Sequence, residues 1–179
     1  MSRFEQIVDT TNHPELAALY EDMVRQGFGD TVPINWLTSQ STRPDILAGT
    51  WRFSKGILLQ GRLPATVKQM IAATIAAQNN CYYCNRLHSN TLSMLGVSEE
   101  IIESCVNDPD LAEVRQPHRA ILQFALKTAR APASITEDDY RALREYSIND
   151  EEILEIIAIV AYCNFINTWA DVSGIQAEQ

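Results

Sequence analysis

Apolar residues recur at spacings of three and four along almost the whole chain, which is the periodicity of one face of an α-helix. No run alternates apolar and polar residues as a half-buried strand would. Helix boundaries are indicated by Pro in first turns, by Asn, Ser or Thr at N-caps and by Gly at C-terminal ends. These signals predict helices over residues 14–27, 43–61, 65–77, 81–96, 98–105, 118–130, 138–146 and 149–174. The sequence therefore predicts an all-α fold of about seven or eight helices.

The segment between the first two predicted helices, residues 28–41, is polar and contains Gly29 and Pro33. We therefore expect a loop there. It also carries Trp36 and Leu37, which we expect to cover the core or a subunit contact rather than to bind a ligand.

Capping boxes mark two of the predicted helix starts, Thr136 with Asp139 and Asn149 with Glu152. Each half of the chain ends a long apolar helix in a glycine–aliphatic pair, at 96–97 and at 174–175. An internal duplication of the chain and an accidental similarity of its two halves explain this pattern equally well, because helical sequences often resemble one another by chance. With no low-complexity segment or linker, we expect one domain over residues 1–179, with a core at about 44–176.

The most chemically distinctive stretch is 81–88, which contains two cysteines and a histidine in a C-x-x-C-x-x-x-H arrangement. On a helix, Cys81, Cys84 and His88 fall on one face, and Cys84 lies one turn before His88. The Asn pair at 79–80 can end one helix and begin the next, which would put Cys81 in a first turn. There the free N–H groups and the helix dipole favour a thiolate.

Three interpretations of this stretch remain open from the residues alone. In a thiol redox centre, one thiolate attacks a peroxide or disulfide, the second cysteine resolves the product, and His88 transfers protons. In a zinc site, Cys105 or His118 would have to supply the fourth ligand. In the third interpretation the side chains simply pack, as we expect of Cys105 and Cys163 in their apolar patterns. A c-type haem is disfavoured because Asn85, not His, follows the second cysteine.

Charge and hydropathy narrow the classes of partner. The chain has 14 basic and 23 acidic residues, a net charge of −9, which disfavours nucleic acid and anionic lipid as partners. The most apolar segment, 153–170, is interrupted by Glu155, Asn164 and Asn167, so it reads as a core helix rather than a membrane span. The first residues lack the apolar run of a signal peptide, and we expect a cytoplasmic, reducing location.

The flanks of the cysteine motif extend the pattern into a recognisable signature. The segments that carry this signature are 63–64, 69–72, 79–84 with His88, 119–125, 150–155 and 161–167. Together they resemble the AhpD-like (alkylhydroperoxidase) branch of the carboxymuconolactone decarboxylase family, over roughly residues 14–176.

This resemblance implies an AhpD-like helical fold that assembles into trimers or hexamers, with Trp36, Leu37 and Trp51 expected on the apolar contact surface. It implies a peroxidase or disulfide-reductase activity in which Cys84 attacks the peroxide. Cys81 would then resolve the product and exchange with a reductant, which is a lipoyl-bearing protein in the best-described member. His88 would match the histidine of the proton relay, and no cofactor or metal is expected.

One departure from the family pattern affects the expected chemistry. AhpD-like sequences have a glutamate twelve residues before the first cysteine, and this chain has Gln69 there. Glutamine hydrogen-bonds but accepts no proton at neutral pH. His88 alone could then act as the base, or Asp171 or Glu155 could approach from elsewhere in the fold. A smaller departure is Tyr83, where the best-described member has histidine.

Our leading hypothesis is a thiol-dependent peroxidase or disulfide reductase acting on (alkyl) hydroperoxides. The alternative is a catalytically weak family member that serves as a redox-responsive oligomeric or ligand-binding protein, which Gln69 favours. A decarboxylase acting on a cyclic lactone acid is a weaker third hypothesis, because that branch generally lacks the cysteine pair.

Overall fold

A computed structural model describes residues 2–108, 110–111 and 113–178. The nine α-helices of this described part are α1 (Pro14–Arg25), α2 (Asn35–Thr38), α3 (Pro44–Ser54), α4 (Ala65–Gln78), α5 (Tyr82–Met94), α6 (Glu99–Asn107), α7 (Gln116–Arg130), α8 (Glu137–Arg144) and α9 (Asp150–Ser173). A π-helical turn, Lys55–Leu59, follows α3, and a 3₁₀ turn, Pro132–Ser134, precedes α8. The predicted all-α fold class is confirmed.

All eight predicted helices are present, with two differences. The expected loop at 28–41 contains the single-turn helix α2, and the predicted helix at 43–61 ends its α-helical part at Ser54. Four residues are too few to show a helical period, and a π turn has no sequence signature of its own.

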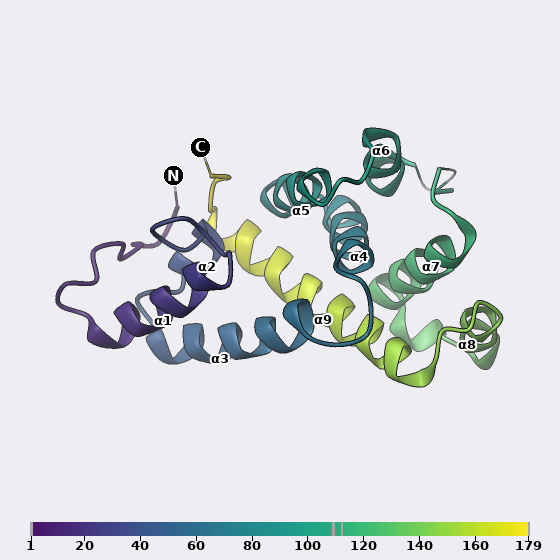
Figure 1. Cartoon of the computed structure of the whole chain (residues 1–179), viewed down its shortest axis with the longest axis horizontal. Helices are drawn as coiled ribbons and strands as arrows, with labels where there is room; N and C mark the ends of the chain where they lie inside the picture. Colours follow the sequence, from purple (N-terminus) through teal and green to yellow (C-terminus); the bar gives the residue numbers. More distant parts are fainter. Residues whose placement is uncertain (1, 109, 112, 179) are drawn as a thin grey trace.

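Helix α9 forms the centre of the molecule and runs obliquely between the group α1–α3 and the group α6–α8 (Figure 1). It packs against α4, α5 and α7, as expected of a core helix. By length and composition alone, α9 is the described helix that could cross a membrane, but half of its apolar stretch is buried inside this fold. Its exposed apolar side chains include Leu154, Phe165 and Val172.

Helix α4 lies next to α5, α6, α7 and α9. Its small side chains Ala72, Ala73 and Ala76 are buried, which lets these neighbours approach closely. The helix ends at the predicted Asn pair, where Asn80 has a left-handed backbone (φ 56°). Asparagine tolerates this conformation better than most residues, so the chain can reverse directly into α5.

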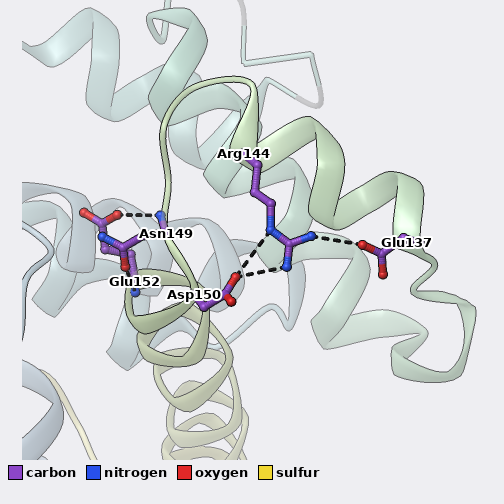
Figure 2. A network of polar contacts seen from close by, with 5 residues as sticks. All are labelled: Glu137, Arg144, Asn149, Asp150 and Glu152. Atoms are coloured by element: carbon purple, nitrogen blue, oxygen red, sulfur yellow. Dashed lines mark hydrogen bonds and ion pairs between the residues drawn. The ribbon is translucent and has the colours of Figure 1, made fainter.

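Both predicted capping boxes are present. At the start of α9, Asn149 Oδ1 accepts from the Glu152 N–H at 3.1 Å, and the Asn149 N–H donates to Glu152 Oε2 at 2.9 Å (Figure 2). Nearby, Arg144 of α8 donates to Glu137 at 3.0 Å and to Asp150 at 3.0 Å, which ties α8 to the first turn of α9 (Figure 2).

The two ends of the chain meet near α2 (Figure 1). The Arg3 N–H donates to the Ser173 carbonyl at 2.8 Å. The Asn35 N–H donates to Glu178 Oε1 at 2.8 Å, and the Asn35 amide donates to the Gln176 carbonyl at 3.0 Å. The C-terminal tail therefore holds α2 against the rest of the fold.

The apolar surface expected on Trp36, Leu37 and Trp51 is not at the surface. The three side chains are 2%, 0% and 2% exposed, so they belong to the core of this chain. Each sits on a helix that packs inward, and the indole N–H of Trp51 is bonded to Asp22 at 2.7 Å.

Candidate thiol site

The sequence-predicted trio comes together around the start of α5. Cys81 is the N-cap residue, with an extended backbone, and Cys84 and His88 follow in the first and second turns. All three are buried, at 0%, 0% and 7% exposed. The preceding turn is fixed by the Cys81 N–H, which donates to the Ala76 carbonyl at 2.9 Å. The arrangement places two free thiols side by side in a water-poor environment.

The expected thiolate at Cys81 is contradicted. The pKa of the Cys81 thiol is raised, first by its hydrogen bond with Cys84, then by burial, and also by a hydrogen bond with Asp171. The helix dipole acts mainly on groups aligned with the first turn, and here burial and the adjacent thiol outweigh it. Cys81 is therefore a protonated thiol at neutral pH.

His88 is held by the residue that departs from the family pattern. Its Nδ1 lies 2.7 Å from Oε1 of Gln69 on α4. An amide oxygen only accepts, so Nδ1 carries the hydrogen and the lone pair is on Nε2. Burial lowers the pKa of His88 to about 4, so the ring is neutral at physiological pH. The result is an oriented neutral imidazole with Nε2 as its proton acceptor.

Neither carboxylate considered as a substitute for glutamate reaches His88. Glu155 pairs with the buried Lys68 at 2.5 Å and accepts the Arg62 N–H at 2.8 Å. Asp171 interacts with the Cys81 thiol. The imidazole therefore faces an amide, and among the described residues no carboxylate acts on its charge.

The site opens into a pocket of about 260 Å³ that Cys84, His88 and Gln69 line. Its walls are mostly apolar and come from several elements: Phe28, Trp36, Leu58, Leu87, Tyr162 and Ile166. Cys81 does not line the pocket, so a ligand meets Cys84 first and Cys81 lies behind it. Apolar walls with a few polar side chains among them are typical of a site for a small organic molecule.

Sequence reasoning missed the role of Trp36. Its side chain is buried, as expected, but it also lines the pocket, and its Nε1–H has no hydrogen-bond partner among the described residues. Leaving a buried donor unpaired costs about 1–3 kcal/mol. A lone tryptophan in a polar segment gives no sequence signal for such a position.

The zinc interpretation lacks its ligands. Within the described ranges, no three His, Cys, Asp or Glu side chains are grouped to hold a metal ion. Cys105 is buried on α6 and burial raises its pKa to about 11, whereas His118 lies 2.9 Å from Arg115. Among the described residues, neither Cys105 nor His118 joins Cys81 and Cys84 in a group that could hold a metal ion.

Residues 44–110, which include the cysteine motif, match the model of the carboxymuconolactone decarboxylase family. No curated protein matches the chain.

Several solved structures share the fold. An AhpD-core, peroxidase-related protein from Ralstonia eutropha JMP134 is similar with a TM-score of 0.90 at 24% identity, covering 99% of this chain and 93% of the other. A peroxidase-related protein from Silicibacter sp. TM1040 gives 0.85 at 22% identity, covering 99% and 95%. A variant of the debrominase Bmp8 in complex with 2,3,4-tribromopyrrole gives 0.79 at 22% identity, covering 99% and 94%. The family model thus matches the part of the chain that carries the cysteine motif, and the whole chain has the AhpD-like fold of these solved structures.

Proposed function

We propose that this protein is a thiol-dependent peroxidase and disulfide reductase that reduces organic hydroperoxides with Cys84 and Cys81. The observation that carries the proposal is the position of Cys84, which lines an apolar pocket together with a neutral, oriented His88. The protonated Cys81 lies behind it as the second thiol. Members of the AhpD-like family are enzymes, which agrees with this assignment.

The reaction follows from these positions. His88 Nε2 takes the proton of the Cys84 thiol, and the sulfur attacks the distal oxygen of the hydroperoxide. The O–O bond breaks, and the organic oxygen leaves as an alcohol after accepting the proton from His88. Cys84 is now a sulfenic acid, which the Cys81 thiol attacks to form a disulfide and release water. Two thiols are oxidised for each hydroperoxide reduced.

Regeneration needs an external dithiol, and we propose a lipoyl-bearing or similar dithiol protein in the cytoplasm as the donor. It would reduce the disulfide by two thiol–disulfide exchange steps. Cys81 is fully buried. Exchange at Cys81 therefore requires the Cys81 side of the site to open, and a small dithiol entering the pocket would reach Cys84 first.

The second candidate is a weak or inactive family member that binds ligands or responds to oxidation. Gln69 favours it, because an amide beside His88 cannot take over the proton that a glutamate would. Loss of general-base help typically costs ~10²–10⁴-fold in rate. This candidate predicts that the thiols oxidise stoichiometrically but turn over slowly.

The decarboxylase hypothesis finds little support at the pocket. A cyclic lactone acid carries a carboxylate, and no Lys or Arg is among the described residues that line the pocket. Burying an unpaired carboxylate there would be strongly unfavourable. A neutral, apolar substrate suits the walls better.

The test is a thiol count on fully reduced protein, which has four cysteines. One equivalent of cumene hydroperoxide should remove two of the four thiols and yield one equivalent of cumyl alcohol. Cys84→Ser should lose no thiols under the conditions that oxidise wild type. Cys163→Ser, which removes a buried cysteine outside the pocket, should lose two thiols as wild type does. An unchanged thiol count in wild type would refute the proposal. Bromide release from 2,3,4-tribromopyrrole, the ligand bound by the debrominase variant, with no reaction of the hydroperoxide would instead assign dehalogenation.

A further inference from the structure

The pocket that contains Cys84 has a buried inner end and an exposed entrance. Cys84, His88 and Tyr162 are 0%, 7% and 1% exposed, so these side chains form the inner end. Among the described lining residues, those exposed to solvent are Gly27, Leu59, Ala65 and Leu95. These four residues form the rim of the pocket, and its two leucine side chains are each 44% exposed.

The rim has no polar side chain, and no Asp, Glu, Lys or Arg is among the described residues that line the pocket. The polar side chains of the lining are half-buried or buried, at Gln69, His88, Thr91 and Tyr162. Exposed leucines at an entrance are stabilised when an apolar group covers them and displaces water. A ligand with one polar end and one apolar end therefore fits with its polar end inward and its apolar end against the rim.

Leu59 is held at the rim by an unusual piece of backbone. It is the last residue of the π-helical turn Lys55–Leu59. The buried ammonium of Lys68 on α4 donates to the Ile57 carbonyl of this turn at 2.7 Å and also to the Gln60 carbonyl that follows it. Turns of this kind are rare in proteins and occur frequently at functional sites. The lysine thus fixes the backbone on both sides of Leu59.

Leu95 is held at the rim by the end of α5, where it is the C-cap residue. Its N–H donates to the Thr91 carbonyl at 3.0 Å and to the Leu92 carbonyl at 3.1 Å. Gly96 then ends the helix with a φ of 79°. The preceding Met94 is 88% exposed and does not line the pocket. Both rim leucines therefore have a backbone position that is fixed before any ligand binds.

We propose that Leu59 and Leu95 form an outer apolar subsite that binds the organic group of a hydroperoxide while its O–O group lies at Cys84. This inference rests on the proposed peroxidase function and narrows its substrate class to hydroperoxides with an unbranched aliphatic chain that reaches the rim. The rim is remote from the O–O bond, so its contacts are the same before and during the reaction. Such contacts lower KM and leave kcat to Cys84 and His88.

The test uses n-butanol, n-hexanol and n-octanol, which are unreactive and differ only in chain length. They are titrated into fully reduced protein and followed by NMR. Each methylene that becomes buried should tighten binding up to about four-fold, so n-octanol should bind at least about thirty-fold more tightly than n-butanol. Leu59→Ser and Leu95→Ser should each reduce this affinity ratio about three- to ten-fold.

The same selectivity should appear in turnover. The ratio of kcat/KM for n-octyl hydroperoxide to that for n-butyl hydroperoxide should fall in Leu59→Ser and Leu95→Ser by the factor seen in binding, and the change should lie in KM. The matched control is Met94→Ser, which removes an exposed apolar side chain next to Leu95 but outside the pocket. It should keep the wild-type ratios.

The outcomes separate the two proposals. Affinity ratios that both rim variants leave unchanged, or that Met94→Ser reduces equally, would overturn the subsite even in an active peroxidase. A lower sedimentation mass of Leu59→Ser with an unchanged ratio would also overturn it, and would assign the rim to a contact between copies of this chain. If wild type shows the expected ratio, the rim variants lose it and no hydroperoxide is consumed, the peroxidase function is overturned and the subsite is supported.

Discussion

Restoring the family carboxylate with Gln69→Glu tests the proton relay directly. The amide oxygen lies 2.7 Å from His88 Nδ1, so a glutamate there would face the same nitrogen. At about 4 Å between charge centres and an effective dielectric constant of about 20, a carboxylate and an imidazolium attract by about 4 kcal/mol. This corresponds to about three pKa units before the cost of burying the carboxylate is subtracted. The pKa of His88 would rise from about 4 toward neutrality.

A base with a pKa near neutrality takes the Cys84 proton more readily, so peroxide reduction should accelerate by at least about ten-fold and at most by ~10³-fold. The assay is consumption of cumene hydroperoxide with excess dithiol between pH 5 and 9, together with NMR titration of His88. Gln123→Glu, which adds the same charge at an exposed position of α7, should change neither quantity. A folded Gln69→Glu protein whose His88 pKa rises without any gain in rate would refute the relay role of this position.

Three other predictions concern stability and assembly. The pKa of His88 is about 4 in the folded protein and 6.5 in the unfolded chain. The stability that depends on a neutral His88 is therefore fully present above about pH 6.5, and the free energy of unfolding falls as the pH drops toward 4. Wild type should therefore lose about 3 kcal/mol more unfolding free energy than His88→Gln between pH 7 and pH 4 in urea titrations, and parallel acid profiles would contradict this. Lys68→Met leaves the Glu155 carboxylate without its buried partner and should cost about 3 kcal/mol in urea unfolding, whereas Lys127→Met at a more exposed pair should cost under about 1 kcal/mol. Equal losses of unfolding free energy in the two variants would show that burial does not make the Lys68–Glu155 pair more important to stability than the Lys127–Asp139 pair. We also propose assembly into trimers or hexamers through the exposed apolar face of α9, so Phe165→Lys should lower the mass found by sedimentation, and a monomeric wild type would contradict the proposal.

The helical framework was predictable because its signals are local. The capping boxes at Asn149 and Thr136 and the left-handed Asn80 depend on residues within one turn of one another. Helix α2 was missed because a single turn, Asn35–Thr38, carries no periodicity. Its position is set by the C-terminal tail, whose Glu178 is 143 residues away from Asn35 in sequence.

The site was predictable in part for the same reason. Helical spacing alone brings Cys84 and His88 to one face, and the structure places both in the pocket wall. The protonation of Cys81 was predicted wrongly, because the helix-dipole argument ignores burial and the neighbouring thiol. The pocket could not be predicted, since Trp36 and Tyr162 reach it from α2 and α9 through packing that no local pattern records.

The central claim is that Cys84 and Cys81 act as one redox pair on a hydroperoxide in the pocket. Peptide mapping by mass spectrometry after one equivalent of cumene hydroperoxide tests it most directly. The account predicts a single new disulfide joining Cys81 and Cys84, with Cys105 and Cys163 still reduced. Oxidation of Cys105 or Cys163 in preference to this pair, or a stable overoxidised Cys84 without any disulfide, would contradict it.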